Sequence, residues 1–172
     1  MTDTERQLRV LYFTRFANSF GFVTLLTLLP TFIDILDPQG FVLGMFATGL
    51  TAAQTVAVVP IAWAGDRFDK RTVLLGGLGL AVVVYAAFPH VTTSWGFIAV
   101  RGAQGIAATA AGLLSLALVG DLARESERAN TIGMANSWRF AAAIGGSLSA
   151  GALYDLYGFD VVFGLLMTIA AA

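Results

Sequence analysis

The chain has 172 residues, of which 57% are hydrophobic and only 12% are charged, and its mean hydropathy is +0.77. A soluble domain carries about 25% charged residues, so this composition is that of a membrane protein. The net charge of −1 and the dispersed basic residues predict no nucleic-acid partner, and the lack of cysteine excludes disulfides and thiolate metal sites.

Apolar runs of about 20 residues, the length that crosses the hydrocarbon of a bilayer, predict six transmembrane helices. We expect them at about 10–33, 41–64, 72–88, 95–119, 131–153 and 161–172, with turns at 34–40, 65–71, 89–94, 120–130 and 154–160. The first run is longer than the apolar region of a signal peptide and is expected to remain as a helix. Residues 161–172 are too few to cross about 30 Å at about 1.5 Å per residue, so we expect a fragment truncated in its sixth helix.

Lysine and arginine predict the orientation of this bundle. Those outside the helices are Arg6, Arg9, Arg67, Lys70, Arg71, Arg124 and Arg128. They fall in the amino terminus and in the loops after the second and fourth helices, while the other three loops contain none. Because cytoplasmic loops are enriched in basic residues, we expect a multi-pass protein of the cell membrane with a cytoplasmic amino terminus.

The two sets of three helices show a weak internal similarity. Residues 15–18 of the first helix, Arg-Phe-Ala-Asn, are similar to residues 101–104 of the fourth, Arg-Gly-Ala-Gln. The segment 62–66 after the second helix has a counterpart at 151–155 after the fifth. Two three-helix units of opposite topology would form an inverted repeat, as in secondary transporters, although chance similarity in so apolar a sequence is the alternative.

A charged hinge between the second and third helices carries the clearest motif. Residues 66–71 contain five charges, between long uncharged runs. The hinge resembles the signature G-x-L-A-D-R-x-G-R-K of the major facilitator superfamily (MFS), which Asp66, Arg67, Lys70 and Arg71 match. Ala62, Ala64 and Asp69 depart from it, and Asp69 stands where the family has a glycine. That glycine permits a tight turn, and Asp tolerates the left-handed backbone conformation better than most residues.

Two further segments resemble the same family. Residues 101–108 are similar to its R-x-x-Q-G-x-x-A signature in the fourth helix, with Arg101, Gln104 and Gly105 in place. Residues 141–146 resemble part of the G-P-x-x-G-G segment of its antiporters: Gly145 and Gly146 are present, and Ala-Ala replaces Gly-Pro. We expect these two glycines to let helices pack closely.

The resemblance covers the whole chain and implies an all-α MFS helix bundle, namely the amino-terminal six-helix half of a twelve-helix transporter whose carboxy-terminal half is missing. It implies a lipid bilayer, a small-molecule substrate and possible coupling to protons. It also implies that Asp66, Arg67, Lys70 and Arg71 form a conformational latch with the other half. The alternative is that the hinge is only a positive-inside anchor.

Polar residues form stripes on the expected helices and predict a cavity near the middle of the membrane. The members on which we expect coupling or binding to depend are Arg15 and Asn18 in the first helix, Gln54 in the second, Arg101, Gln104 and Gly105 in the fourth, and Asn136 and Arg139 in the fifth. The third helix offers only Tyr85 and is expected to be peripheral and to face lipid. Arg15 and Arg139 could instead extend to the cytoplasmic interface.

No carboxylate lies within an expected helix core, and the nearest is Asp34 at the outer end of the first helix. The resemblance implies that Arg101 takes part in proton coupling, with Asp34 or a residue of the missing half as the acid. Three arginines in one cavity would alternatively suit an anionic substrate.

The leading hypothesis is a secondary active transporter working by alternating access, with proton-coupled efflux of drugs or metabolites favoured by the antiporter segment. The alternatives are uptake of a small organic or anionic solute, and a non-transporting half-transporter that acts as a membrane scaffold or receptor. We expect no enzyme and no cofactor, because no P-loop, catalytic acid–base pair or metal-binding set occurs within the helices.

Overall fold

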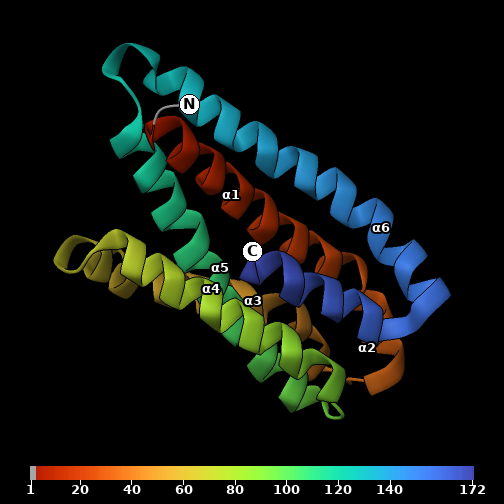
Figure 1. Cartoon of the computed structure of the whole chain (residues 1–172). Coiled ribbons are helices and arrows are strands. Elements are labelled where there is room, and N and C mark those ends of the chain that lie inside the picture. Colours follow the sequence, from red (N-terminus) through yellow and green to blue (C-terminus); the bar gives the residue numbers. More distant parts are fainter. Residues whose placement is uncertain (1–2) are drawn as a thin grey trace.

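The computed structural model describes residues 3–172, and nearly all of them are helical (Figure 1). The elements are α1 (Asp3–Thr27), α2 (Leu29–Leu36), α3 (Phe41–Arg67), α4 (Lys70–Ala87), α5 (Ser94–Leu122) and α6 (Arg128–Ala171), with short 3-10 turns η1 (Phe88–His90) and η2 (Glu125–Glu127). By length and apolar composition, four helices of the described chain could cross a membrane, or five if α1 and α2 count as one span. The all-helical membrane architecture is therefore confirmed, whereas the six spans and the inverted repeat stay predictions.

The first expected helix is broken near its outer end. α1 starts at Asp3, seven residues earlier than predicted, and the axes of α1 and α2 differ by 43°. Pro30 occupies the first turn of α2, and because proline has no N–H, it cannot continue the hydrogen-bond ladder of α1. The predicted turn at 34–40 begins late, since α2 runs to Leu36 before Asp37 adopts a left-handed conformation.

The turn expected at 154–160 is wrong in its extent. Helical structure continues from Arg128 through this segment and departs from helical geometry only at Gly158, whose φ is 74°. A positive φ costs glycine nothing, so a single residue can redirect the chain. Two helical segments, 128–157 and 159–171, therefore take the place of the fifth and sixth predicted helices, and the chain turns sharply between them (Figure 1).

The hinge between α3 and α4 shows why Asp69 can replace a glycine. Asp69 has ordinary extended dihedrals, with φ −61° and ψ 120°, so the expected need for a left-handed residue is wrong. Its carboxylate caps α4 by accepting hydrogen bonds from the Thr72 backbone N–H at 3.1 Å and from the Thr72 hydroxyl at 3.0 Å. The backbone bond and then the hydroxyl bond hold the pKa of this exposed carboxyl below its ordinary value.

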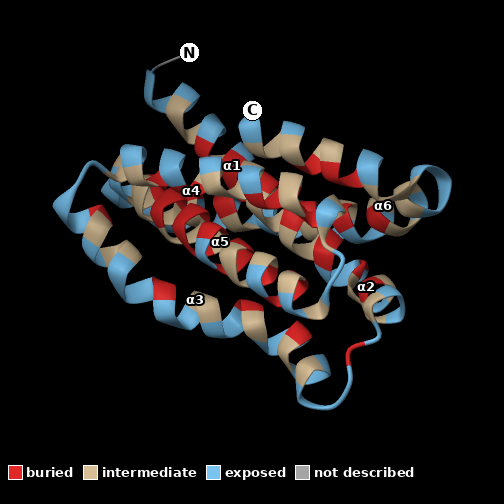
Figure 2. Ribbon diagram, turned by 90° about the horizontal axis from the view of Figure 1, so that it is seen from below, coloured by how far each residue is buried: buried red, intermediate tan, exposed pale blue. Residues whose placement is uncertain are grey.

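Helix α5 lies at the centre of the bundle and packs against α1, α3, α4 and α6 (Figure 2). The most extensive interface joins α1 to α6. Glycines make the closest approaches: a Cβ at Gly146 would lie 2.9 Å from the Phe20 carbonyl oxygen, and one at Gly105 would lie 2.6 Å from that of Leu50. Small residues thus bring α6 against α1 and α5 against α3, as expected where lipid supplies no hydrophobic force between helices.

One apolar cluster joins the helix ends that lie far from the charged hinge. Phe46 and Phe97 stack with ring centroids 4.3 Å apart, and Phe88 and Phe163 stack at 5.2 Å. Phe32 of α2 contacts three of these rings. Each such pair contributes about 0.5–1.5 kcal/mol beyond its buried area, so this cluster fixes the outer turns relative to one another.

Candidate functional site

A polar cavity of about 320 Å³ lies between α1, α5 and the first segment of α6. It is lined by Arg15, Asn18, Ser19 and Phe22 of α1, Ala108, Gly112 and Leu116 of α5, and Arg139 of α6. The polar stripes predicted for the first, fourth and fifth helices therefore meet in part. Intramembrane arginines are costly and usually face such cavities, so this is the candidate site.

Arg15 connects the three helices around the cavity. Its guanidinium donates from Nη1 to the Gly112 carbonyl oxygen at 3.0 Å and from Nη2 to Asn136 Oδ1 at 3.1 Å. Only 7% of the Arg15 side chain is exposed, and its Nε has no hydrogen-bond partner. The alternative that Arg15 extends to the cytoplasmic interface is therefore wrong, because its head group points into the bundle.

Asn18 supports the same wall one turn further along α1. Its Nδ2 donates to the Ala108 carbonyl oxygen of α5 at 3.3 Å. A Cβ at Gly112 would lie 3.5 Å from this Nδ2, so a small residue leaves room for the amide. On α5 the acceptors for Arg15 and Asn18 are thus backbone carbonyls, which residue types alone did not indicate.

Arg139 lines the cavity in a different way. Its side chain is exposed, and its guanidinium carbon lies 4.8 Å from the centroid of the Phe140 ring. Within residues 3–172, the structure shows no ion pair or hydrogen bond from this guanidinium. Arg139 is therefore the available cation of the site, whereas two of the three guanidinium nitrogens of Arg15 are already used.

Arg101 and Gln104 lie apart from this cavity. Arg101 Nη1 donates to Gln104 Oε1 at 2.6 Å, and the two side chains are 3% and 2% exposed. Tyr85 of α4 lies close enough to interact with both, and it is also buried. A side chain at Gly21 would collide with the Tyr85 hydroxyl, so α1 closes over this cluster. The third helix was expected to be peripheral and to face lipid, and the structure shows that one of its faces, with Tyr85, packs into the interior.

The remaining predicted cavity residues lie elsewhere. Gly105 packs α5 against α3, and Gln54 is half-buried beside it, 3.3 Å from the position of a Cβ at Gly105. Asp34 is exposed on α2. Arg101 Nε and Gln104 Nε2 are buried without partners, which indicates that the polar interior continues beyond the lined cavity.

The four hinge residues divide into two pairs. Lys70 Nζ forms an ion pair with Asp121 at the end of α5 at 2.6 Å, and Arg71 Nη2 donates to Gln7 Oε1 of α1 at 2.8 Å. Asp66 and Arg67 are exposed at the end of α3. The charge motif predicted a hinge at these four residues. It did not predict their partners Asp121, at the end of α5, and Gln7, near the start of α1.

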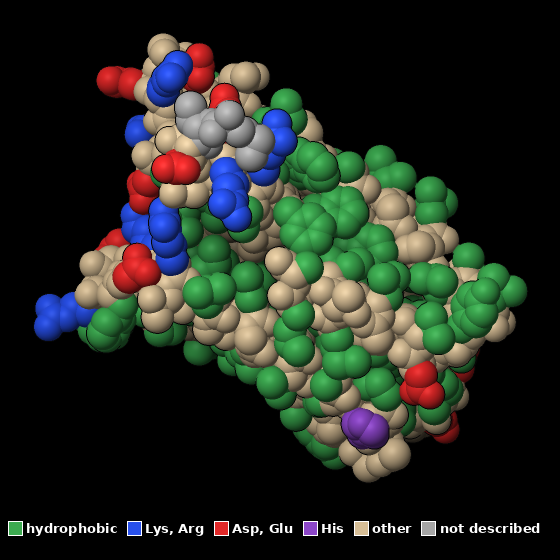
Figure 3. All heavy atoms as spheres, viewed as in Figure 1, with side chains coloured by type: hydrophobic (Ala, Val, Ile, Leu, Met, Phe, Trp, Pro, Cys, Tyr) green, Lys and Arg blue, Asp and Glu red, His purple; other side chains and the backbone are tan. Residues whose placement is uncertain are grey.

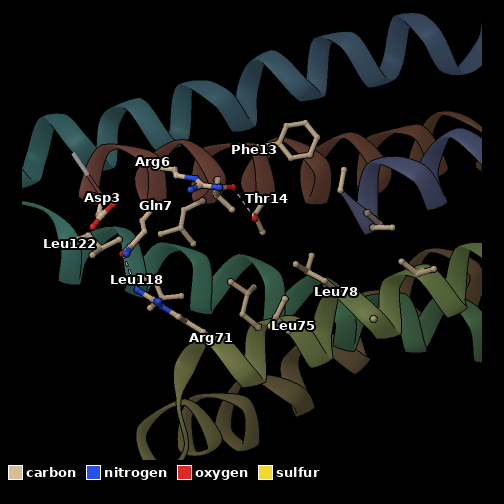
Figure 4. A pocket seen from close by; sticks show the side chains of 18 residues that line it. Asp3, Arg6, Gln7, Phe13, Thr14, Arg71, Leu75, Leu78, Leu118 and Leu122 are labelled. Atoms are coloured by element: carbon tan, nitrogen blue, oxygen red, sulfur yellow. Dashed lines mark hydrogen bonds between the residues drawn. The ribbon is translucent and has the colours of Figure 1, made fainter. Parts of the chain in front are cut away.

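A larger hollow of about 820 Å³ lies between α1, α4, α5 and the end of α6 (Figure 4). Its walls are apolar and include Leu75, Leu78 and Leu118, while Asp3, Arg6 and Arg71 are at one rim. These walls supply few groups that could hold a polar solute. We therefore take the smaller, arginine-lined cavity as the functional site.

Comparison with known proteins agrees with the motifs. No curated protein matches the chain. The family model of the Major Facilitator Superfamily matches residues 11–172, which is nearly the whole chain and includes every helix that lines the cavity. The chain therefore belongs to the Major Facilitator Superfamily of membrane transporters.

Proposed function

We propose that this chain is the amino-terminal half of a secondary transporter that moves a small solute across the cell membrane by alternating access. The observation that carries the proposal is the cavity between α1, α5 and α6, with Arg15, Asn18 and Arg139 on its walls. Such polar groups are expensive inside an apolar bundle and are retained where a solute or ion must be bound. A second six-helix half would complete the cavity.

The distribution of charge supports a cytoplasmic amino terminus. Basic side chains gather at the end of the bundle where α1 begins, and the single histidine lies toward the opposite end (Figure 3). The loops between α3 and α4 and between α5 and α6 are at the basic end. Cytoplasmic loops carry the excess of lysine and arginine, so we place this end in the cytoplasm.

Asp66 and Arg67 are the hinge residues best placed to act as a latch. Lys70 and Arg71 already contact Asp121 and Gln7 within this half. Asp66 and Arg67 are exposed, so they are available to the other half when the cytoplasmic side closes. Contacts that form in only one of two states bias the equilibrium between those states.

Efflux by proton antiport is our preferred mode, and it is favoured by the antiporter-like segment that contains Gly145 and Gly146. A proton site would use Asp34 or an acid of the second half. Arg101, which the family resemblance links to proton coupling, is buried and bonded to Gln104, so it would act through its charge and not by contact with the solute. Uptake of an organic or anionic solute is the second mode, and the two cavity arginines favour it.

Transport is tested with the full-length protein in proteoliposomes that contain a pH-sensitive dye. A pH gradient is imposed, and candidate solutes are added in turn. Movement of protons that depends on both solute and protein supports coupled transport. Solute movement without proton movement retains transport and removes the coupling. Absence of any solute movement favours the scaffold or receptor alternative.

The latch is tested with Asp66→Asn. We expect normal insertion and an unchanged cavity, but altered transport, because the variant changes only the closed cytoplasmic contact. Cysteine-accessibility labelling of the cavity wall should report a shifted balance between the two states. Asp155→Asn, which removes an exposed carboxylate outside both the hinge and the cavity, is the matched control. Normal transport and unchanged labelling in Asp66→Asn would show that the hinge is only an anchor.

A further inference from the structure

The cavity contains two positive charges and no negative one. Arg15 and Arg139 both line it, and none of its eight lining residues is acidic. Their charges are close enough to repel each other. Two like charges with no acidic neighbour on the lining give the cavity a positive potential, which favours the entry of negative charge.

The two arginines are not equivalent toward a ligand. Arg15 is nearly buried, and it uses Nη1 and Nη2 to hold α5 and α6. Arg139 is exposed and has no anionic partner in residues 3–172. A planar guanidinium can bind a carboxylate or phosphoryl group with two parallel hydrogen bonds. Arg139 is thus the residue that can meet an incoming anion.

The rest of the wall fits a small amphipathic solute. Asn18 keeps one amide N–H beyond the one donated to Ala108, and the Ser19 hydroxyl is a further donor on the wall. Phe22 and Leu116 supply an apolar surface. A volume of about 320 Å³ within this half is at the small end of ligand pockets, which is enough room for the carboxylate or phosphoryl group of such a solute.

We propose that the solute carries an anionic group, a carboxylate or phosphoryl, which Arg139 binds with the help of Asn18 and Ser19. Arg15 is a positioning residue that holds the three helices and adds positive potential. This inference rests on the proposed transport function and narrows its substrate class. The competing role for Arg139, pairing with an acid of the second half, would leave no preference for anions.

The test uses the full-length protein in detergent and four probes of similar shape. Benzoate and phenyl phosphate are anionic, benzamide is neutral, and benzylammonium is cationic. Isothermal titration calorimetry at pH 7 measures their affinities for the wild type, Arg139→Gln, Arg139→Lys and Arg124→Gln. Arg124 is an exposed arginine outside the cavity and serves as the matched control. Size-exclusion chromatography confirms that each variant is folded.

We expect at least one anionic probe to bind and the neutral and cationic probes to bind at least about tenfold more weakly. Arg139→Gln should lose about tenfold or more in anion affinity, Arg139→Lys should retain part of it, and Arg124→Gln should equal the wild type. The comparison of benzoate with phenyl phosphate tells which anionic group is preferred. High salt should weaken the binding of either anion.

Three results would overturn the proposal: no binding of either anion, equal binding of benzamide or benzylammonium, or unchanged anion affinity in Arg139→Gln. The proteoliposome assay separates this failure from failure of transport. If neutral or cationic solutes are carried, transport stands and the anion assignment falls. If anions bind but no solute is carried, the anion site stands and transport falls.

Discussion

Two adjacent glycines of α6 provide a stringent test of the α1–α6 interface. A Cβ at Gly146 would lie 2.9 Å from the Phe20 carbonyl oxygen and 3.4 Å from Phe20 Cα, so the backbone of α1 would have to move. A Cβ at Gly145 would lie 3.8 Å from Phe20 Cε2, which is ordinary contact with a side chain. Alanine should therefore be tolerated at Gly145 and should strain the interface at Gly146.

The magnitude follows from comparing the two variants. Replacing a helical glycine with alanine gains up to about 1 kcal/mol of helix propensity, and this gain is common to both positions. Overpacking costs about 1–3 kcal/mol and applies only to Gly146→Ala. At about 2–4 °C per kcal/mol for a chain of this size, Gly146→Ala should unfold about 2–12 °C below Gly145→Ala.

The assay is thermal unfolding in detergent, followed by the loss of the monodisperse peak in size-exclusion chromatography. Gly145→Ala is expected to equal or slightly exceed the wild type, and Gly146→Ala to fall below it. Equal midpoints for the two variants, or a lower midpoint for Gly145→Ala, would refute the close approach of α6 to the Phe20 backbone.

The hinge yields two further predictions. Asp69→Ala should lower the unfolding temperature at pH 7, because it removes the cap of α4. Since the pKa of Asp69 is lowered by folding, this stabilisation should be complete above the ordinary Asp pKa of about 3.9 and be lost as the pH falls through the lower folded pKa. Thermal scans at a series of pH values measure the difference in unfolding temperature between wild type and Asp69→Ala. Asp69→Asn keeps an uncharged cap, so its own unfolding temperature should not fall with pH for this reason. A difference between wild type and Asp69→Ala that does not change with pH would contradict the role of the carboxylate. For Lys70 and Asp121, whose side chains are 32% and 56% exposed, a double-mutant cycle with alanine should give a coupling of about 0.2–1 kcal/mol at low salt. That coupling should shrink in high salt, and a salt-independent value would mean that the ion pair is not its source.

Much of the fold could be predicted because charges and turn residues interrupt the apolar runs. The predicted 41–64 and 95–119 correspond to α3 and α5, both of which run three residues further at their carboxy ends, while α3 begins where predicted and α5 one residue earlier. The ends differ because amphipathic flanks such as 3–9 continue a helix beyond its apolar core. Hydropathy measures the apolar core and not the capping that ends a helix.

The breaks were harder to predict than the spans. Pro30 was visible as a residue near the end of the first helix, but its consequence, a 43° bend, depends on how α2 packs through Phe32 into the aromatic cluster. At 154–160 the local residues suggested a turn, whereas packing keeps the segment helical up to Gly158. Proline thus ends α1 by its own chemistry, whereas the direction of α2 and the continuation of the helix to Gly158 depend on the neighbouring structure, which outweighs weak local preferences.

The polar residues were predicted to line one cavity, but in the structure they form two separate clusters, one around the cavity and one around Arg101. Helical spacing predicted that Arg15, Asn18 and Arg139 share a common space, and in the structure they line one cavity, with Asn136 bonded to Arg15. It also placed Arg101 and Gln104 there, although they face Tyr85 in a sealed cluster. Spacing along one helix tells which residues share a face, but the neighbouring helix decides whether that face is covered.

The three intramembrane arginines show what this difference means for function. All three carry the same charge and cost about 2.5–3.5 kcal/mol each at mid-helix, so composition treats them alike. Their partners differ: Arg101 bonds to a neighbouring glutamine, Arg15 bonds to two other helices, and the Arg139 guanidinium lies on an aromatic ring with no anionic partner among residues 3–172. A charge whose partners are built into the fold stabilises one arrangement of helices. A charge without such a partner is available to pair with a ligand. Ligand binding should therefore depend directly on Arg139, whereas Arg15 and Arg101 should affect binding only by holding the helices around the cavity in place.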